Sequence, residues 1–459
     1  MKKTHFKQII LSVSMLLSLN SIGQNANFID YGFIPTPSVS AGKDGASEFQ
    51  TAIFNNGEIF IATSDGIWKN NISTQQWSSS GLQGKKISCI YKHPSIANKM
   101  FAGAQITTNN STPLFISNDS GITWLPVTST ITETIYCIAV SPTNPDHIYA
   151  NVASTDIISS QDGGINWSAP SGGFGYESNI IFTPSDGNTI YQGSENPLDC
   201  AWLGKYDIDS NNPDSIMNFQ YVADGNCGSG PWENRRPNKL QTYSYTGNMI
   251  YVGQEGALSK VDPTQLNSIT FIYKSEGEPN KPYTYVYGIW VDPLDINHVI
   301  FGGSKNGDNT GLMQIYETWD EGATFHRYTQ TFGVTTPSIC DIVHIDNNKV
   351  ALIIYDQSVD RIKLIIMEPS QPLSIPNNQI KPENVSIYPN PADNTLNIDF
   401  SNVMNYDKIR VNIYSTDGKL IKSENMHANS LNLESFESGI YHLILNLDEQ
   451  KIHKKFIVD

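Results

Sequence analysis

The chain has 459 residues, which is too long for one ordinary domain and predicts two or three. Charged residues make up only 16%, while 34 Gly, 24 Pro and 22 Tyr suit short strands joined by many turns, so we expect an all-β protein. The formal net charge is −16, and residues 28–369 hold 34 acidic side chains against 18 basic ones. An acidic body repels phosphate backbones, so nucleic acid is not an expected partner.

The first segment, residues 1–23, has the features of a secretory signal peptide. Three lysines precede an apolar run from Ile9 to Leu19, and Ser21 and Gly23 suit the two small positions before a cleavage site. The run is shorter than the roughly 20 residues that a membrane span needs. We therefore predict cleavage after Gly23 rather than an uncleaved anchor, and no transmembrane segment in the mature chain.

A short phrase recurs seven times along residues 27–369: an apolar pair or triplet, usually with an aromatic residue, followed by small residues. Its reference positions are Phe60, Phe101, Tyr149, Tyr191, Tyr251, Phe301 and Ala351. Four copies follow a proline that marks a turn, at Pro94, Pro142, Pro184 and Pro293, and a further apolar run lies upstream. Periods of about 40 to 50 residues that hold four strands are typical of β-propellers, so we predict seven blades.

A second phrase, in which Ser or Thr, Asp, Gly and an aromatic residue keep a fixed spacing, follows three of the units. It reads SNDSGITW, SQDGGINW and TWDEGATF, and it resembles the Asp-box, the bacterial neuraminidase repeat also found in sortilin-like propellers. The resemblance implies a hairpin between the third and fourth strands of a blade, on the face away from the ligand. Asp would accept backbone N–H bonds, Gly would take a positive φ, and the aromatic would pack between blades. The residues with these structural roles would be Asp119, Gly121, Trp124, Asp162, Gly164, Trp167, Asp320, Gly322 and Phe325.

The seventh repeat has room for only three strands before the chain becomes rich in proline. We predict that the segment NFIDYGFIP, residues 27–35, supplies the missing outer strand and so closes the ring.

Five cysteines in an exported chain leave at least one unpaired. Cys200 and Cys227 bracket a loop-like insertion, where a disulfide would add roughly 3 to 4 kcal/mol by restricting the unfolded chain; two free thiols are the alternative. Cys89, Cys137 and Cys340 lie 12, 12 and 11 residues before their reference positions. We therefore expect them at equivalent, buried sites on the inner strands.

The tail begins with a proline-rich linker, residues 370–384, and continues with alternating strands and turns over residues 385–459, which predict a small antiparallel sandwich. The order of YPNP, a strand, a Thr-Asp-Gly-Lys hairpin, a Gly-x-Tyr strand and a lysine-containing last strand resembles the type A C-terminal sorting domain of the type IX secretion system. The resemblance implies recognition by the type IX machinery and removal by a sortase-like peptidase. The protein would then be released or held at the cell surface, and an immunoglobulin-like accessory domain is the alternative.

Unequal loops are expected on the face where the chain enters each inner strand. They could bring aromatic and charged residues together, and the ligand-binding candidates are Tyr176, Trp232, Arg235, Arg236, Tyr283 and Tyr285. Aromatic platforms beside charged groups suit a sugar or a peptide ligand. The same residues could instead fill space between blades.

Catalysis is the second possibility for this face. A sialidase is not expected, because the propeller holds only four arginines and no Arg-Ile-Pro phrase opens its first blade. Xyloglucan-cleaving propellers need two acids roughly 6.5 to 9.5 Å apart, and the catalytic candidates are Asp44, Glu48, Glu177 and Glu233. Those enzymes usually join two propellers around the cleft, whereas this chain has one.

No metal or cofactor is expected. The segment NGDNTG, residues 306–311, has oxygen ligands at a spacing that could hold structural calcium, but it lacks the bidentate Glu that follows in calcium loops. The sequence thus predicts a secreted or surface-held propeller that recognises a glycan or an extracellular protein. A polysaccharide hydrolase and a structural component of the surface layer are the alternatives.

Overall fold

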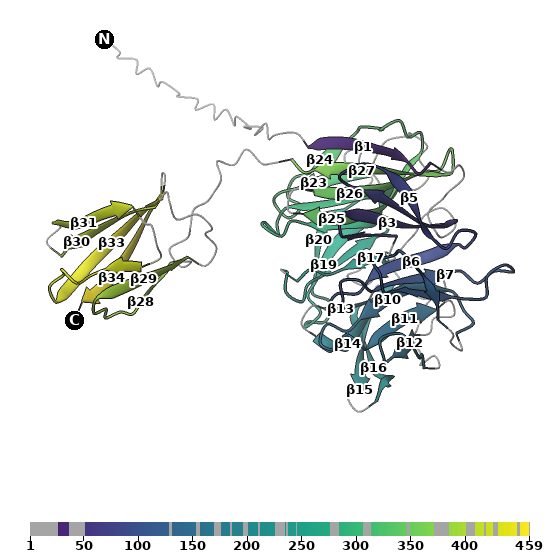
Figure 1. Cartoon of the computed structure of the whole chain (residues 1–459), viewed down its shortest axis with the longest axis horizontal. Helices are drawn as coiled ribbons and strands as arrows, with labels where there is room; N and C mark the ends of the chain where they lie inside the picture. Colours follow the sequence, from purple (N-terminus) through teal and green to yellow (C-terminus); the bar gives the residue numbers. More distant parts are fainter. Residues whose placement is uncertain are drawn as a thin grey trace, which may run out of the picture. The chain divides into compact units, whose positions relative to one another are not determined.

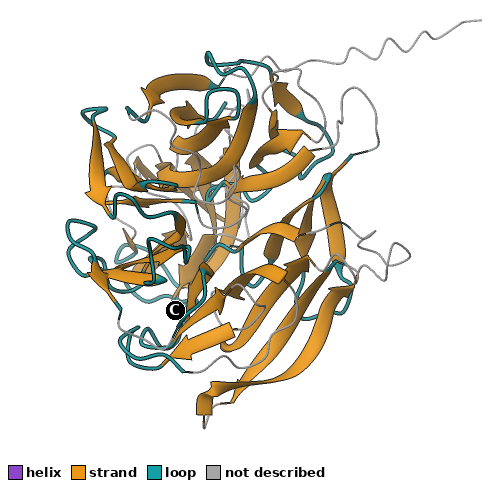
Figure 2. Cartoon of the chain, turned by 90° about the vertical axis from the view of Figure 1, so that its right-hand side faces the viewer, coloured by secondary structure: helices purple, strands orange, loops and turns teal. Residues whose placement is uncertain are grey.

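The computed structural model describes residues 26–35, 51–127, 131–152, 157–168, 176–183, 186–195, 201–209, 212–224, 235, 237–244, 246–275, 284–305, 314–346, 349–370, 385–400, 409–416, 419–425, 430–447 and 450–458. All regular structure in these residues is β-strand (Figures 1 and 2). Within them, no helix has the length and apolar character needed to cross a membrane. The chain divides into two units, Asn25–Ser370 and a second one that contains Gln371–Asp459.

The described part of Asn25–Ser370 forms seven antiparallel sheets, and we call each a blade. Blade 1 contains β2 (Ala52–Asn55), β3 (Glu58–Thr63), β4 (Gly66–Asn71) and β5 (Trp77–Gly81). Blade 2 contains β6 (Ile87–Lys92), β7 (Met100–Ala104), β8 (Leu114–Ser117) and β9 (Leu125–Pro126). Blade 3 contains β10 (Ile135–Val140), β11 (Ile148–Val152) and β12 (Ile157–Ser160).

The next three blades repeat this order from the inner strand outward. Blade 4 contains β13 (Tyr176–Thr183), β14 (Asp186–Glu195), β15 (Trp202–Asp209) and β16 (Asn212–Asp224). Blade 5 contains β17 (Pro237–Gln241), β18 (Ile250–Gln254), β19 (Ala257–Val261) and β20 (Ile269–Lys274). Blade 6 contains β21 (Thr284–Val291), β22 (Val299–Lys305), β23 (Gln314–Thr318) and β24 (His326–Tyr328).

Blade 7 joins the two ends of this unit. It contains β25 (Pro337–Asp346), β26 (Lys349–Asp356), β27 (Arg361–Glu368) and β1 (Asn27–Phe33). The N-terminal strand β1 pairs antiparallel with β27, with Asn27 opposite Glu368 (Figure 1). The outer strand of the last blade therefore comes from residues 27–33, as the sequence predicts.

The inner and second strands of the blades are buried along most of their length because both of their faces are covered by other blades. In β3, every residue from Ile59 to Thr63 is buried, and all of β7 is buried. The outer strand β5 is instead half-exposed. Short continuous apolar runs, rather than strict alternation, thus identify these strands in the sequence.

Hydrophobic clusters fill every junction between neighbouring blades. Between blades 1 and 2, Phe60 packs in one cluster with Ile90. Equivalent clusters lie at the following five junctions. The last cluster joins Ile353 of blade 7 to Ile59 of blade 1. The blades therefore form a closed ring, and this unit is a β-propeller.

One sequence expectation about blade 4 is wrong. The sequence predicts a loop-like insertion between Cys200 and Cys227, but this segment contains the strands β15 and β16. The two strands pair antiparallel, with Trp202 opposite Asp224 at one end and Asp209 opposite Asn212 at the other. Phe219 packs edge-on against Trp202, so apolar contacts hold this hairpin. Both cysteines lie outside the described residues, and their pairing stays a prediction.

The second unit is a sandwich of two sheets. One sheet contains β28 (Val385–Tyr388), β29 (Thr395–Phe400) and β32 (Ser430–Asn432). The other contains β31 (Leu420–Asn425), β30 (Ile409–Ser415), β33 (Gly439–Leu447) and β34 (Gln450–Val458). Their inner faces share one core, in which Leu396 and Ile398 pack with Val411 and Leu443.

Candidate functional site

The inner strands of the propeller share a local distortion. In six of the seven, the pairing register with the next strand shifts near the start of the inner strand, as at a β-bulge. The residues at which pairing resumes are Cys89, Cys137, Asn179, Lys239, Gly288 and Asp341. We call these six residues the bulge ring.

Two cysteines of the bulge ring connect neighbouring inner strands. The Cys89 Sγ lies 3.9 Å from the carbonyl oxygen of Ile135 in blade 3. The Cys137 Sγ lies 3.4 Å from the carbonyl oxygen of Ile180 in blade 4. Burial raises the pKa of the Cys137 thiol to about 12, and it raises the pKa of Cys89 as well. Both side chains are therefore protonated packing groups rather than nucleophiles.

The third cysteine is not equivalent to the other two. Cys340 is buried, as expected, but it occupies the extra residue of the bulge in β25, and Asp341 takes the position that Cys89 and Cys137 hold. The spacing misleads because the turn in this blade is shorter: Val343 pairs with Ala351, 8 residues later, whereas Tyr91 pairs with Phe101, 10 residues later. None of these three described cysteines is in a disulfide.

A buried ion pair occupies the other side of the bulge ring. The Lys239 Nζ lies 3.0 Å from the Asp341 Oδ1, and both side chains are less than a tenth exposed. Lys239 reaches from blade 5 to blade 7, and Gly288 of blade 6 lies between them with no side chain in the way. A Cβ at Gly288 would lie 2.5 Å from the Ile342 side chain.

Asp341 also ties the last blade to the first. Its Oδ2 accepts a hydrogen bond from the Ala52 backbone N–H at 3.3 Å, and its Oδ1 accepts one from Ile342 at 3.0 Å. Burial raises the pKa of Asp341, and the Lys239 ammonium partly offsets this shift. The pair is therefore a structural clamp whose charges cancel.

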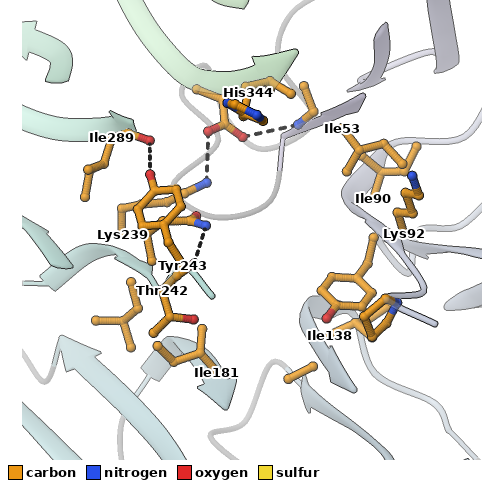
Figure 3. A pocket seen from close by; sticks show the side chains of 18 of the residues that line it. Ile53, Ile90, Lys92, Ile138, Ile181, Lys239, Thr242, Tyr243, Ile289 and His344 are labelled. Carbon is orange, nitrogen blue, oxygen red and sulfur yellow. Dashed lines mark hydrogen bonds and ion pairs between the residues drawn. The ribbon is translucent and has the colours of Figure 1, made fainter. Parts of the chain in front are cut away.

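A cavity of about 450 Å³ lies in the central channel beside the ion pair (Figure 3). All seven inner strands contribute to its walls. Most lining side chains are apolar, among them Ile53, Phe54, Ile90, Tyr91, Ile138, Ile181, Phe182, Leu240, Tyr243, Ile289 and Trp290. They come from the later half of each inner strand or the turn after it, so the cavity lies toward the face that carries those turns.

We call this face the turn face. The hairpins between third and fourth strands lie on it too, since strand direction alternates along a blade. Ser120 in the blade 2 hairpin donates its N–H to the Asn98 carbonyl in the turn after β6, at 2.9 Å, and Glu321 donates likewise to Asn297 at 3.1 Å. The opposite face, where the chain enters each inner strand, is called the leading face.

The three Asp-containing hairpins of the turn face share one hydrogen-bond pattern. In the first, the Asp119 Oδ1 accepts the N–H groups of Ile122 and Thr123 at 3.1 and 2.8 Å, and its Oδ2 accepts the Thr123 hydroxyl at 2.6 Å. The Thr123 bonds hold the pKa of Asp119 at about 2. Asp162 and Asp320 accept equivalent backbone bonds.

The glycine and aromatic positions of these hairpins close the turn against the core. Gly121, Gly164 and Gly322 have φ of 80°, 93° and 94°. A Cβ at Gly121 would lie 2.7 Å from the Phe60 ring, so the close approach also requires glycine. The Trp124 Nε1 donates to the Ser80 carbonyl of blade 1 at 3.0 Å, which links neighbouring blades. Trp167 packs in the cluster of blades 2 and 3, and Phe325 against that of blades 5 and 6.

The leading face brings two of the predicted ligand residues near one another. The Arg235 Nη1 donates to the Glu255 carbonyl at 3.1 Å, and Glu255 in turn forms a β-bridge with Tyr285. The rings of Tyr285 and Tyr287 lie 6.4 Å apart, and Tyr287 is only 8% exposed. Arg235 and Tyr285 are therefore neighbours at the mouths of blades 5 and 6.

The other predicted site residues are not placed. Asp44, Glu48, Trp232, Glu233, Arg236, Tyr283 and the calcium candidate 306–311 lie outside the described residues. For Tyr176 and Glu177, the backbone belongs to β13 but the side chains are not described. Their catalytic or binding roles stay predictions.

The ion pair was not among the predictions, although the sequence contains a signal for the position of one of its two residues. Lys239 and Asn179 lie 12 residues before their reference positions, as Cys89 and Cys137 do, so aligning the repeats would have placed Lys239 at the channel. Asp341 lies only 10 residues before Ala351. Its partner role therefore required the structure.

A buried charged cluster in blade 6 was missed as well. His298 contacts Asp292 through Nδ1 at 2.8 Å and Glu317 through Nε2 at 2.7 Å. Burial lowers the pKa of His298, but the bonds to the two carboxylates outweigh it and raise the pKa to about 9. Glu317 also accepts the Ser370 hydroxyl at 2.9 Å, so the cluster anchors the end of the propeller unit.

Comparisons with known proteins identify the C-terminal unit and the fold of the other. Residues 386–459 match the family model of the secretion system C-terminal sorting domain. The chain is therefore exported through the type IX secretion system, either to the cell surface or into the medium. A search among curated proteins finds no match to the chain.

Solved structures with similar folds are β-propeller proteins. PorZ, a bacterial surface component of the type IX secretion system of Porphyromonas gingivalis, has 13% identity and a TM-score of 0.50, over 91% of this chain and 60% of that protein. The GH74 enzyme of Niastella koreensis has 14% identity and a TM-score of 0.51, over 94% and 66%. The GH74 xyloglucanase of Xanthomonas campestris has 13% identity and a TM-score of 0.54, over 93% and 62%. The chain spans less than two thirds of the length of each, and identities this low show the fold alone.

Proposed function

We propose that this chain is a seven-bladed propeller with Asp-box hairpins that acts as a recognition module for a glycan or an extracellular protein. Its signal peptide, residues 1–23, would direct export across the inner membrane. A sortase-like peptidase would then remove the sorting domain, and the propeller would be released or attached to surface lipopolysaccharide.

The observation that carries this proposal is the grouping of Arg235 and Tyr285 around Glu255 on the leading face. The half-buried Tyr285 ring lies 6.4 Å from the buried ring of Tyr287, and the Glu255 backbone connects Tyr285 to the Arg235 guanidinium. Aromatic faces stack on sugar rings and on peptide side chains, and arginine binds their acidic groups. Trp232 and Tyr283 are close in sequence to this group and would extend it.

The alternative function is a polysaccharide hydrolase, and the fold shared with two GH74 enzymes favours it. Hydrolysis with inversion needs two carboxyl groups facing each other across the substrate. Among the described residues that line the channel cavity, Asp341 is the one carboxylate, and Lys239 neutralises it. On the leading face, where a hydrolase would bind its substrate, the acid pair would have to come from Asp44, Glu48, Glu177 or Glu233.

The test uses the purified full chain on an array of polysaccharides and extracellular proteins, with Trp232→Ala and Glu233→Ala in parallel. Recognition predicts that binding falls at least tenfold with Trp232→Ala and that no ligand is cleaved. Cleavage that Glu233→Ala abolishes, while binding persists, would establish the hydrolase instead. No binding to any glycan or protein would contradict both functions and leave the structural role.

A second test concerns export. Deletion of residues 385–459 should keep the propeller inside the cell envelope, because the sorting domain carries the recognition signal. The measurement is protease accessibility on intact cells. A chain without residues 385–459 that still reaches the cell surface would contradict a role of this domain in sorting.

A further inference from the structure

The channel cavity opens on a different face from the proposed recognition site. Its lining residues follow the bulge ring along each inner strand and extend into the turns at Pro94 and Pro142. Arg235 lies just before β17 and Tyr285 near the start of β21, so both precede the bulge ring and belong to the leading face. The cavity is therefore a separate place for a ligand, about 450 Å³ in volume, within the range of small-molecule sites.

Most polar groups of the cavity are already committed to the protein. The Tyr243 hydroxyl donates to the Ile289 carbonyl at 2.9 Å, and the Thr242 hydroxyl donates to the Phe182 carbonyl at 3.2 Å. Figure 3 shows Lys239 and Tyr243 on one wall, facing the other wall across the open space. The Lys239 ammonium is neutralised by Asp341. These groups orient the wall but offer little to a ligand.

Two groups of the cavity keep hydrogen-bond donors free. Lys92 lies on the wall that also carries Ile90 and Ile138 (Figure 3), and within the described part of the chain it forms no ion pair. The His344 Nδ1 accepts the indole N–H of Trp290 at 2.9 Å. Because the indole nitrogen can only donate, the neutral His344 ring carries its proton on Nε2. Both groups can therefore donate to an acceptor on the ligand.

The charge of the cavity has the opposite sign to that of the whole protein. Its described lining holds one neutralised pair and the unpaired Lys92 cation, whereas the chain as a whole carries −16. The apolar wall includes Ile53, Phe54 and Ile181, which are only half-buried and so present carbon surface to the channel. An occupant needs an apolar body and one anionic end.

We propose that the channel cavity on the turn face binds a carboxylate that carries an apolar group, with Lys92 as its charge partner and His344 as a second donor. The apolar group would contact Phe54, Ile181 and Phe182. The carboxylate can come from a free organic acid or from the C-terminus of a peptide. This site goes beyond the proposed recognition on the leading face and does not depend on it.

The test is calorimetric titration of the full chain at pH 7 with two matched pairs of probes. The first pair is 4-phenylbutyrate and its amide, and the second is the peptide Ala-Ala-Phe with a free and with an amidated C-terminus. We expect a carboxylate of at least one pair to bind at least tenfold more tightly than its amide. Tighter binding of the acid identifies a free organic acid, and tighter binding of the peptide identifies a C-terminus. Equal affinity of acid and amide in both pairs, or no binding, would overturn the proposal.

Variants assign the binding to the cavity. Lys92→Met keeps the length of the side chain but removes its charge, and it should weaken carboxylate binding at least tenfold. Ile181→Trp should do the same by filling the space. Lys69→Met is the matched control, because Lys69 is paired with Glu58 in blade 1 and does not line the cavity. Wild-type affinity in Lys92→Met, with an unchanged melting temperature, would overturn the assignment.

Discussion

Blades 2 and 3 differ from blades 5 and 7 in what they place at the same position of the bulge ring. Cys89 and Cys137 are small and uncharged at neutral pH, and the thiol of each contacts a carbonyl oxygen of the next inner strand. Lys239 and Asp341 are charged and reach past blade 6 to each other. The repeat therefore fixes where the backbone bulges, while the side chain at that position decides how far around the channel the contact extends.

Removal of one partner of the ion pair should have the largest effect on stability. Asp341→Ala leaves the Lys239 ammonium buried without a counter-charge and the Ala52 N–H without its acceptor. A broken buried pair costs about 3 to 5 kcal/mol, so the free energy of unfolding should fall by about that amount. Urea denaturation followed by tryptophan fluorescence measures it.

The double variant Lys239→Met with Asp341→Leu is the control for this prediction. It removes both charges and keeps similar volume, so it should recover most of the lost stability. A double variant as unstable as Asp341→Ala would show that packing, rather than the unpaired charge, causes the loss.

The charged cluster of blade 6 should have a smaller, pH-dependent effect. The pKa of His298 in the folded protein is about 9, above its ordinary value of 6.5, so its stabilising contribution is complete below about pH 6.5 and is lost as pH rises through 9. His298→Gln should lower the free energy of unfolding by about 2 kcal/mol at pH 6 and by little above pH 9.5. Urea denaturation at the two pH values measures the difference.

The matched variant is His147→Gln, because His147 contacts the Asn144 amide and not a carboxylate. It should show no comparable pH dependence. A loss in His298→Gln that stays constant from pH 6 to 9.5 would contradict the assignment of a protonated His298 between Asp292 and Glu317.

The thiol side of the bulge ring should respond less to substitution than the ion-pair side. Cys137→Ala removes one buried sulfur and should cost about 1 to 2 kcal/mol, which is less than the loss in Asp341→Ala. Since the pKa of Cys137 is about 12, the thiol should not react with a disulfide reagent at pH 8 in the folded protein. Reaction of Cys137 before unfolding, detected by mass spectrometry, would show that the channel wall opens.

The smallest effect concerns a hairpin of the turn face. Asp119→Ala removes the acceptor of the Ile122 and Thr123 N–H groups, so these amides should exchange with solvent faster while the core stays protected. The pKa of Asp119 is about 2, below its ordinary value of 3.8, so its contribution is present above about pH 4 and is lost as pH falls through 2. Hydrogen exchange at pH 6 measures the change, and unaltered exchange at both amides would contradict it.

Sequence reasoning predicted the parts of the fold that the repeat encodes. Apolar runs around Phe60 and its equivalents gave the inner and second strands, and the missing strand of blade 7 led to β1. The insertion between Cys200 and Cys227 was mistaken for a loop, since β15 and β16 lack the repeated phrase and carry several polar residues. A repeated sequence pattern can be assigned to strands because each copy supports the assignment of the others. A hairpin that occurs once has no such support.

The candidate site was less predictable because it depends on residues far apart in sequence. Lys239 and Asp341 are separated by 102 residues, and they meet only because the closed ring brings their strands together. Likewise, only the hydrogen bonds of Trp290 and Tyr243 show which donors of the cavity are used within the protein. They leave the donors of Lys92 and His344 for a ligand. The loop sequences predict aromatic residues near charged ones, and they do not tell which charges are already neutralised.

The most direct test of recognition against hydrolysis is one sample in which binding and sugar release are measured together. The full chain is incubated with xyloglucan and with each glycan that it retains on the array, and new reducing ends are counted over a day. Recognition predicts retention with no reducing ends above those of a chain-free control. Reducing ends that increase with time, and that Glu233→Ala abolishes, would contradict it and show that this propeller is an enzyme.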